Sequence, residues 1–277
     1  MAVEPGELVV CPTPIGNLGD VTLRALDELR RADIAACEDT RRSRTLLTRH
    51  GVDLPLLSLT EHNEAARIPE IGGRIDRGER VCLLSDAGTP ALADPGARLI
   101  AAMIEAGRSV TVLPGPSAVT TAVVASGMAG GGFCFAGFLP RGRGRLDAAL
   151  ELLDPTGLPI VCFESPNRLS ATLAALADRD PGRSVAVCRE LTKLHEEVVR
   201  GTAAEMAERF SQPPKGEITL VLGPGAAGER RIDPAVLREL AGAVGARRAA
   251  AIGATLSGRG RNELYRMLTE GGQQAPG

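Results

Sequence analysis

The sequence predicts an α/β protein of two αβ domains followed by a small helical module. Apolar runs typical of strands alternate with amphipathic runs typical of helices through the first half of the chain, as in folds built around a largely parallel sheet. Strand-like runs return after Pro116, and only helical periodicity remains from about residue 230. We therefore expect αβ domains at 1–115 and 116–226 and a helical C-terminal module at 227–277.

The first domain is expected to alternate strands with helices. Its strand-like runs are short and apolar, at 8–14, 34–37, 54–59, 81–86 and 109–115. Its helices have amphipathic periodicity, near 20–31, 40–49, 63–77 and 96–106. This strict alternation predicts parallel strands joined by crossover helices.

The second domain is expected to open with a helix of small residues at 117–127. Its strand-like runs lie at 133–140, 158–166, 184–191 and 217–225. Two further helices are expected at 167–179 and 202–211, with a flexible arginine-rich stretch, RGRGR, at 141–145. The terminal module should contain two or three short helices with a Gly-rich turn at 258–260.

Composition narrows the class of protein. With 277 residues and 44% hydrophobic side chains, the chain can bury a core in each domain. No run reaches the roughly 18 apolar residues of a membrane span, and the N-terminus lacks the pattern of a signal peptide. We therefore expect a cytoplasmic protein without membrane association.

Charge and special residue types exclude other classes. A net charge of −2 and only 2% aromatic residues argue against a surface coated with cations or a base-stacking sheet. The six cysteines have no CxxC spacing and lie in apolar runs, which predicts buried side chains. The three histidines are scattered, so no metal site is expected.

Gly- and Pro-rich turns follow several predicted strands, where open α/β sheets usually bind ligands. These turns are PTPIGNLGD (12–20), SDAGTPALADPG (85–96), LPGPSA (113–118) and FESPNR (163–168). Asp86 can accept hydrogen bonds from a ribose or an amino group, Gly88 permits close backbone approach, and Ser117 begins a helix with free N–H groups. An ordinary helix-capping turn is the alternative for each loop alone. The glycine patterns of Rossmann, P-loop and α/β-hydrolase proteins are missing from the sequence.

Together and in this order, the segments of residues 8–225 closely resemble the ribosomal RNA 2′-O-methyltransferase branch of the tetrapyrrole methylase family. The segments are PTPIGNLGDVTLRAL, ACEDTRRSRTLL, SLTEHNE, LLSDAGTPALADPG, LPGPSAVTTAVVASG, FAGFLPRGR, FESPNR and CRELTKLHEE. NELY (262–265) fits the terminal module of that branch. One departure is Asn167, where the family usually has histidine, so a role of that histidine in proton exchange is in doubt here.

The resemblance implies a two-domain fold of the class III S-adenosylmethionine methyltransferases, with the cofactor between the two αβ domains. The implied reaction is 2′-O-methylation of a cytidine in 16S rRNA, either free or assembled in the 30S subunit. The implied state is a homodimer without a metal. By motif, the cofactor-binding residues are Ile15, Gly16, Asp86, Gly88, Thr89, Ser117, Ala118, Phe163 and Leu191.

A ribose hydroxyl is a poor nucleophile, so a nearby base, or a cation that favours the alkoxide, would assist it. Glu164 and Lys193 are the preferred catalytic candidates because both lie in second-domain motifs. Further candidates are Glu38, Asp39 and Glu190. For each of these residues, a surface or helix-capping role is the alternative.

Phosphate contacts require cations, and two arginine clusters adjoin the implicated loops. They comprise Arg41, Arg42, Arg44, Arg141, Arg143 and Arg145. The alternative is a solvated helix start. Arginines of the terminal module could also bind rRNA, or could pack on the core or on a partner subunit: Arg247, Arg248, Arg259, Arg261 and Arg266.

Two other functions stay open at this point. A precorrin-type or diphthine-type methylase would keep the fold and cofactor, but its substrate would not need arginine clusters beside the cofactor. A non-enzymatic RNA- or nucleotide-binding module is the second alternative, and Asn167 is the feature that favours it.

Overall fold

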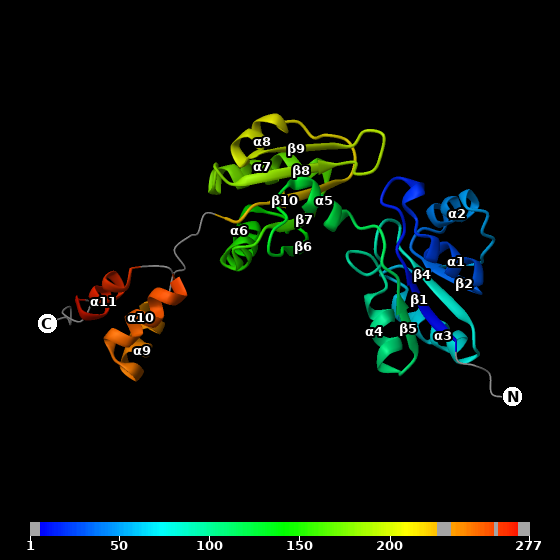
Figure 1. Ribbon diagram of the computed structural model, residues 1–277, viewed down its shortest axis with the longest axis horizontal. Helices are drawn as coiled ribbons and strands as arrows, with labels where there is room; N and C mark the ends of the chain where they lie inside the picture. The colour runs from blue at the N-terminus through cyan, green and yellow to red at the C-terminus, as the bar shows by residue number, and fades with distance from the viewer. Residues whose placement is uncertain (1–5, 226–233, 258–259, 271–277) are drawn as a thin grey trace. The chain divides into compact units, whose positions relative to one another are not determined.

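The computed structural model describes residues 6–225, 234–257 and 260–270. They form two five-stranded sheets with their helices, and a C-terminal group of helices (Figure 1). Both sheets belong to one compact unit, made of Met1–Leu139 and Pro159–Leu222.

The first sheet is parallel throughout, with strand order β3-β2-β4-β1-β5. Its strands are β1 (Glu7–Cys11), β2 (Ile34–Cys37), β3 (Leu56–Ser58), β4 (Arg80–Leu84) and β5 (Ser109–Val112). Helices pack on both faces of this sheet, which explains why its central strands are continuous apolar runs rather than alternating ones. The predicted parallel alternation is confirmed for this half of the chain.

Two separate cores bury the two faces of the first sheet. On one face, Leu29 of α1 (Leu23–Arg31) and Leu47 of α2 (Thr40–Arg49) pack against the strands. On the other face, residues of α3 (Glu64–Asp76) and α4 (Ala97–Glu105) do so. All the polar turns that follow β1, β2, β4 and β5 are therefore left at the carboxyl edge of the sheet.

The second sheet is mixed, with order β6-β7-β10-β8-β9, and only β6 and β7 run parallel. Its strands are β6 (Cys134–Phe138), β7 (Ile160–Glu164), β8 (Ser184–Arg189), β9 (Glu197–Thr202) and β10 (Ile218–Leu222). Val119, Ala122 and Val123 of α5 (Ala118–Ser126) pack on the central strands. Two further helices, α7 (Pro166–Arg179) and α8 (Ala203–Arg209), contact each other, and α8 also contacts β8 and β9.

Two elements of the second half differ from the sequence prediction. Strand β9 was not predicted, because Glu197, Arg200 and Gly201 interrupt its apolar pattern, as is common in edge strands. Helix α6 (Arg143–Leu153) includes part of the stretch expected to be flexible. Leu146 and Leu150, four residues apart, are both buried, and this spacing outweighs the Arg-Gly start of the helix.

The described part of the C-terminal module is helical, as predicted: α9 (Pro234–Val244), α10 (Ala246–Ser257) and α11 (Arg261–Glu270). Leu237, Ala250 and Leu264 form a small core of their own. Residues 258 and 259 of the expected turn, and with them Arg259, lie outside the described residues. This module, with Pro140–Leu158, forms the second compact unit, which also contains the short helix η2 (Asp154–Thr156).

Several sequence-level expectations can be compared with the described residues. None of the described helices has the length and apolar character needed to cross a bilayer. Nor do the described residues include a group of three or more His, Cys, Asp or Glu side chains that could hold a metal ion. All six cysteines are free and, except for the half-buried Cys134, fully buried, in agreement with their predicted packing role.

Candidate active site

Three loops at the carboxyl edge of the first sheet are tied together by hydrogen bonds. The N–H of Thr13, after β1, donates to the carbonyl of Gly88 at 2.8 Å, and the N–H of Gly88, after β4, donates back to Thr13 at 3.0 Å. The hydroxyl of Thr89 donates to the carbonyl of Pro116, after β5, at 3.4 Å. The predicted convergence of these loops is therefore a preformed feature of the fold.

The backbone conformation at this edge favours glycine. Gly88 has φ +79°, a left-handed conformation, whereas an added Cβ atom would make only an ordinary contact with Cγ2 of Ile15, at 3.4 Å. Strain is also concentrated nearby: the described non-glycine residues with positive φ are Ala91, Glu190 and Thr192. They lie in the loops after β4 and β8, and such strain is often found where backbone is held for ligand binding.

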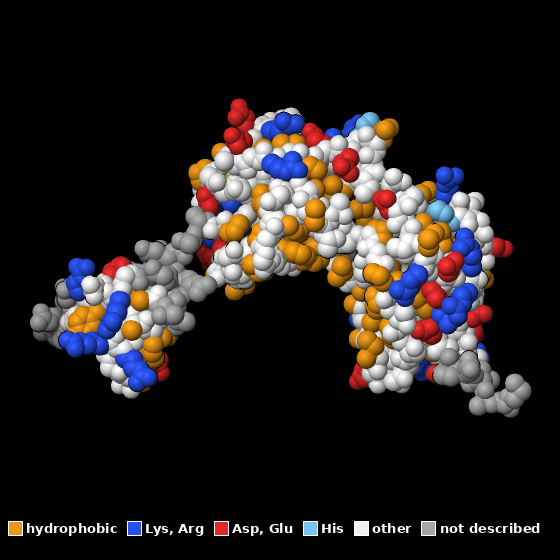
Figure 2. Space-filling view, in the orientation of Figure 1, with side chains coloured by type: hydrophobic (Ala, Val, Ile, Leu, Met, Phe, Trp, Pro, Cys, Tyr) orange, Lys and Arg blue, Asp and Glu red, His pale blue; other side chains and the backbone are white. Residues whose placement is uncertain are grey.

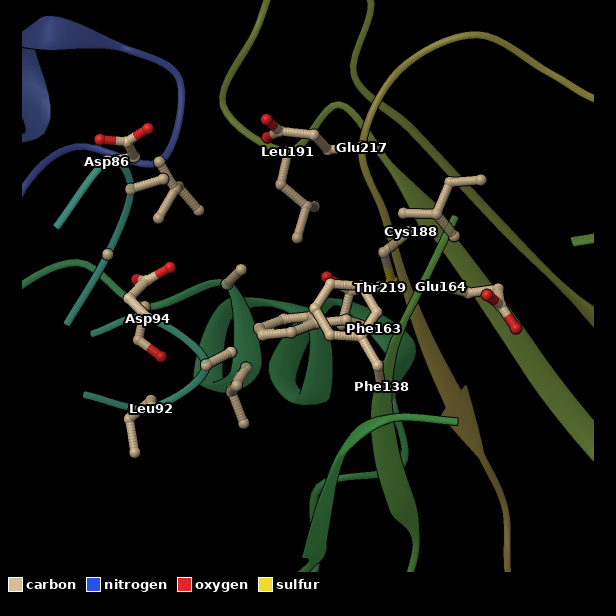
Figure 3. A pocket seen from close by; sticks show the side chains of 18 of the residues that line it. Asp86, Leu92, Asp94, Phe138, Phe163, Glu164, Cys188, Leu191, Glu217 and Thr219 are labelled. Atoms are coloured by element: carbon tan, nitrogen blue, oxygen red, sulfur yellow. The ribbon is translucent and has the colours of Figure 1, made fainter. Parts of the chain in front are cut away.

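A cavity of about 560 Å³ opens beside these loops, and strands of the second sheet form its apolar side. Phe163 of β7 lies at its centre, with ring centroids 5.2 Å from Phe135 and 5.6 Å from Phe138 (Figure 3). Leu191 and Cys188 extend this wall. An aromatic and aliphatic surface of this kind suits a planar ring system.

The opposite side of the larger cavity is acidic. Asp86 and Asp94 of the loop after β4 lie there (Figure 3), and Glu38 at the end of β2 also lines the cavity. Burial, with repulsion from Glu38 and Asp86, raises the pKa of Asp94 to about 6. Partial burial and the charge of Asp86 also raise the pKa of Glu38. Carboxylates that repel one another in this way would be stabilised by a bound cation.

The structure brings together the residues predicted to bind the cofactor. Eight of the nine line the larger cavity: Ile15, Asp86, Gly88, Thr89, Ser117, Ala118, Phe163 and Leu191. The ninth, Gly16, lines a smaller adjoining cavity together with Ile15. Their role in binding stays a prediction.

The carboxylate of Glu164 is occupied by contacts within its own domain. Oε2 accepts a hydrogen bond from the Thr172 hydroxyl at 2.6 Å, and Oε1 accepts one from the N–H of Ser165 at 2.7 Å. Arg168 lies 3.3 Å from Oε1, and the side chain is fully buried and directed away from the other labelled acids (Figure 3). This geometry favours a structural role at the start of α7 over proton transfer to a substrate.

Lys193, the other preferred catalytic candidate, lines the smaller cavity. Its Nζ donates to Glu190 at 2.8 Å and to Glu217 at 2.9 Å. Partial burial lowers the pKa of Lys193, but these two hydrogen bonds outweigh it and raise the pKa above its ordinary value. Lys193 is therefore suited to act as a cation rather than as a base.

The three arginines of the first cluster, Arg41, Arg42 and Arg44, contact different partners. The Arg41 guanidinium binds Asp39 at 2.9 and 3.1 Å, and this contact lowers the pKa of Asp39 to about 2. Arg44 donates to the carbonyl of Leu54 at 3.2 Å. Only Arg42 of the three lines the cavities, with Nε 3.7 Å from Oδ2 of Asp86. The three arginines therefore do not form one continuous patch.

The remaining arginine candidates belong to the second compact unit. Arg141, Arg143 and Arg145 are exposed where α6 begins. The described arginines of the C-terminal helices are exposed as well, and Figure 2 shows basic side chains, in blue, over these helices. Their contact with RNA stays a prediction.

Asn167, the departure from the family pattern, is exposed in the first turn of α7 and is not among the residues that line either cavity. The exchange of histidine for asparagine therefore changes none of the residues that line the two cavities.

Several residues of the larger cavity were not singled out from the sequence, among them the polar residues Asp94, Glu217 and Thr219. Asp94 stands in the recognised loop, but its Asp-Pro-Gly setting is typical of a plain turn. Glu217 directly precedes β10 and Thr219 is its second residue, and their position could have been suspected from the Gly-Glu that precedes that apolar strand.

Comparisons with known proteins point in one direction. Residues 7–207 match the family of tetrapyrrole (corrin/porphyrin) methylases. A ribosomal RNA small subunit methyltransferase I from Mesorhizobium japonicum is 42% identical over 275 residues, covering 97% of this chain and 92% of the relative. A protein of the same name from Thermotoga maritima is 45% identical over 218 residues, covering 78% and 98%. The uroporphyrin-III C-methyl transferase from Thermus thermophilus, solved in complex with S-adenyl homocysteine, has a similar fold, with TM-score 0.57, 18% identity and coverage of 79% and 97%.

Proposed function

Because the chain belongs to the tetrapyrrole methylase family, we propose that it transfers a methyl group from S-adenosylmethionine to the 2′-hydroxyl of a cytidine in 16S rRNA. The relatives named as ribosomal RNA small subunit methyltransferases support an rRNA substrate. The observation that carries the proposal is the acidic and aromatic cavity at the edge of the first sheet. The substrate implies action in the cytoplasm, where ribosomal subunits form, and the family resemblance implies a homodimer.

The residues of the larger cavity fit this methyl donor. Asp86, Asp94 and Glu38 supply negative charge, which complements the sulfonium and ammonium groups. Phe163 and Leu191 offer an apolar surface for adenine. Gly88 leaves room for the donor to approach the backbone. The preformed loops hold these groups in place before binding, which lowers the entropic cost of orienting the reactants.

The donor supplies an electrophilic methyl group: a bond forms from the ribose oxygen to the methyl carbon while the carbon–sulfur bond breaks and its electron pair stays on sulfur. The hydroxyl proton leaves to a carboxylate or to water. Of the two preferred catalytic candidates, Lys193 can stabilise negative charge that develops on the acceptor oxygen. Glu164 instead holds the start of α7, and through it the adjacent Phe163.

The test is a methyl-transfer assay with radiolabelled S-adenosylmethionine and purified 30S subunits, naked 16S rRNA or uroporphyrinogen III. We expect label in rRNA only, and mass spectrometry of nuclease digests should locate it as 2′-O-methylcytidine. The subunits must come from a strain that lacks this enzyme, so that the target ribose is unmodified. Label in the tetrapyrrole, or on an rRNA base instead of a ribose, would contradict the proposal.

A further inference from the structure

A second cavity, of about 320 Å³, adjoins the larger one. The two share part of their walls, at Ile15, Arg42, Asp86, Ala87 and Glu217. Its volume is at the lower end of the range for ligand sites, roughly 300–1,000 Å³. A compact ligand there would be separated from a ligand in the larger cavity only by these shared side chains.

We propose that this smaller cavity binds the acceptor nucleotide, with the phosphate of the RNA chain between Arg42 and Lys193. The inference rests on the proposed function and adds to it the site at which the acceptor nucleotide of the RNA binds. The ribose would lie against the wall shared by the two cavities, so that its 2′-oxygen faces the donor.

Charge distinguishes the two cavities. Among the described residues that line the larger one, Arg42 is the one basic side chain, against five carboxylates, those of Glu38, Asp86, Asp94, Glu164 and Glu217. The smaller cavity balances two basic residues, Arg42 and Lys193, against Asp86 and Glu217, and Lys193 is hydrogen-bonded to Glu217 and Glu190. A cationic donor therefore fits the larger cavity, and an anionic phosphate meets less negative charge in the smaller one.

The contacts of Arg42 leave it able to accept a new partner. Its Nε lies 3.7 Å from Oδ2 of Asp86, longer than a hydrogen bond, and 60% of its side chain is exposed. A phosphate could therefore bind the guanidinium without displacing a buried ion pair. If Arg42 turns from Asp86 to the phosphate, the positively charged donor on the other side of Asp86 can take the place of Arg42 as the partner of that carboxylate.

Close packing between two loops fixes the positions of Gly16 and Lys193, which line the smaller cavity. The N–H of Asn17 donates to the hydroxyl of Thr192 at 3.0 Å. A Cβ on Gly16 would lie only 2.5 Å from Cγ of Lys193, so only glycine permits this approach. The left-handed backbone of Thr192, with φ +67°, sets the position from which Lys193 reaches the cavity.

Two substitutions test the inference. Arg42→Gln removes the proposed phosphate contact, and Thr45→Phe places a ring in the cavity from an exposed position of α2, where it should not disturb folding. Arg30→Gln on α1, which removes one exposed and ion-paired arginine, is the matched control. For each protein, the KM for 30S subunits is measured at several KCl concentrations, and the Kd for S-adenosylhomocysteine is measured by calorimetry.

We expect Arg42→Gln to raise the KM about tenfold and to reduce the log–log salt slope by about one. Thr45→Phe should reduce kcat/KM at least as much. Thr45→Phe should bind S-adenosylhomocysteine within twofold of the unsubstituted protein, Arg42→Gln should bind it no more weakly than that protein, and Arg30→Gln should match that protein throughout. The inference would be overturned if the variants were active with unchanged KM and salt slope. It would also be overturned if they lost donor affinity as strongly as RNA affinity. Neither result would contradict the proposed function. An unsubstituted protein that binds the donor but methylates no RNA would overturn the proposed function as well.

Discussion

The two sheets contribute different chemistry to the larger cavity. The parallel sheet supplies polar loops, because all of its strands end at one edge and their turns carry Asp86, Asp94 and Ser117. The mixed sheet supplies mostly side chains from its strands, with Phe163 and Cys188 forming an apolar wall. From this difference we expect the first half of the chain to recognise mainly charge and the second half mainly shape. Substitutions in the two halves should therefore weaken binding in different ways.

The largest effect is expected from Asp86→Ala, on the polar side. Its Oδ1 accepts a hydrogen bond from the N–H of Asp39 at 3.0 Å, so the carboxylate is held in position for a ligand. Loss of a hydrogen bond to a charged group costs about 1.5–3 kcal/mol. We expect the Kd for S-adenosylmethionine to rise about thirtyfold by calorimetry. Asp27→Ala, which removes an exposed carboxylate from α1, is the control, and equal affinity of the two variants would contradict the assignment.

Acidification should have the next largest effect. Protonation of Asp94, whose pKa is raised to about 6, removes a negative charge from the cavity as the pH falls. The Kd for the cationic donor should therefore rise about tenfold between pH 7 and pH 5. Asp94→Asn should bind weakly at both values and show a flat profile. If the Kd of Asp94→Asn for the donor changed with pH as it does in the unsubstituted protein, a group other than Asp94 would be responsible for the pH dependence.

Protonation of Asp94 should stabilise the folded protein, although it weakens binding of the donor. Since its pKa is raised in the folded protein, its stabilising contribution is present below its ordinary pKa and is lost as the pH rises through about 6. Asp94→Asn should therefore raise the Tm of the free protein at pH 7, while it weakens binding of the donor. A lowered Tm at pH 7 would contradict this explanation.

A smaller effect is expected on the apolar side. Phe163→Leu keeps most of the buried area but removes the ring proposed to contact adenine, together with its contacts to Phe135 and Phe138. Such contacts contribute about 0.5–1.5 kcal/mol beyond area. We expect the Kd for S-adenosylhomocysteine to rise about fivefold, and to do so equally at low and high salt. The exposed Phe133→Leu serves as control, and a salt-dependent loss would break the proposed division between the two sheets.

The smallest effect is expected from Asn167→His, which restores the usual residue of the family. Because Asn167 is exposed and lines neither cavity, kcat and the Kd for the donor should stay within twofold from pH 6 to pH 8. A new titration in kcat near neutral pH would show that this position communicates with the reacting groups.

Much of the fold, and the grouping of the loops around the larger cavity, could be predicted for identifiable physical reasons. The parallel sheet was predictable because its buried strands are continuous apolar runs with Gly- and Pro-rich turns between them. Strand β9 was missed because edge strands tolerate charge, and α6 because its first turn is Arg-Gly-Arg. Periodicity could not show that the Glu164 carboxylate turns toward Thr172, since orientation at the end of a strand depends on tertiary packing. Asp94 was overlooked because its pKa depends on residues distant in sequence, such as Glu38.

The most direct test of the account is a crystal structure of the protein with S-adenosylhomocysteine. We predict the adenine against Phe163, the amino acid part near Asp94 and Asp86, and the sulfur directed toward the wall shared with the smaller cavity. Ligand density outside the larger cavity, or a sulfur atom that faces away from Asp86 and Arg42, would contradict the account.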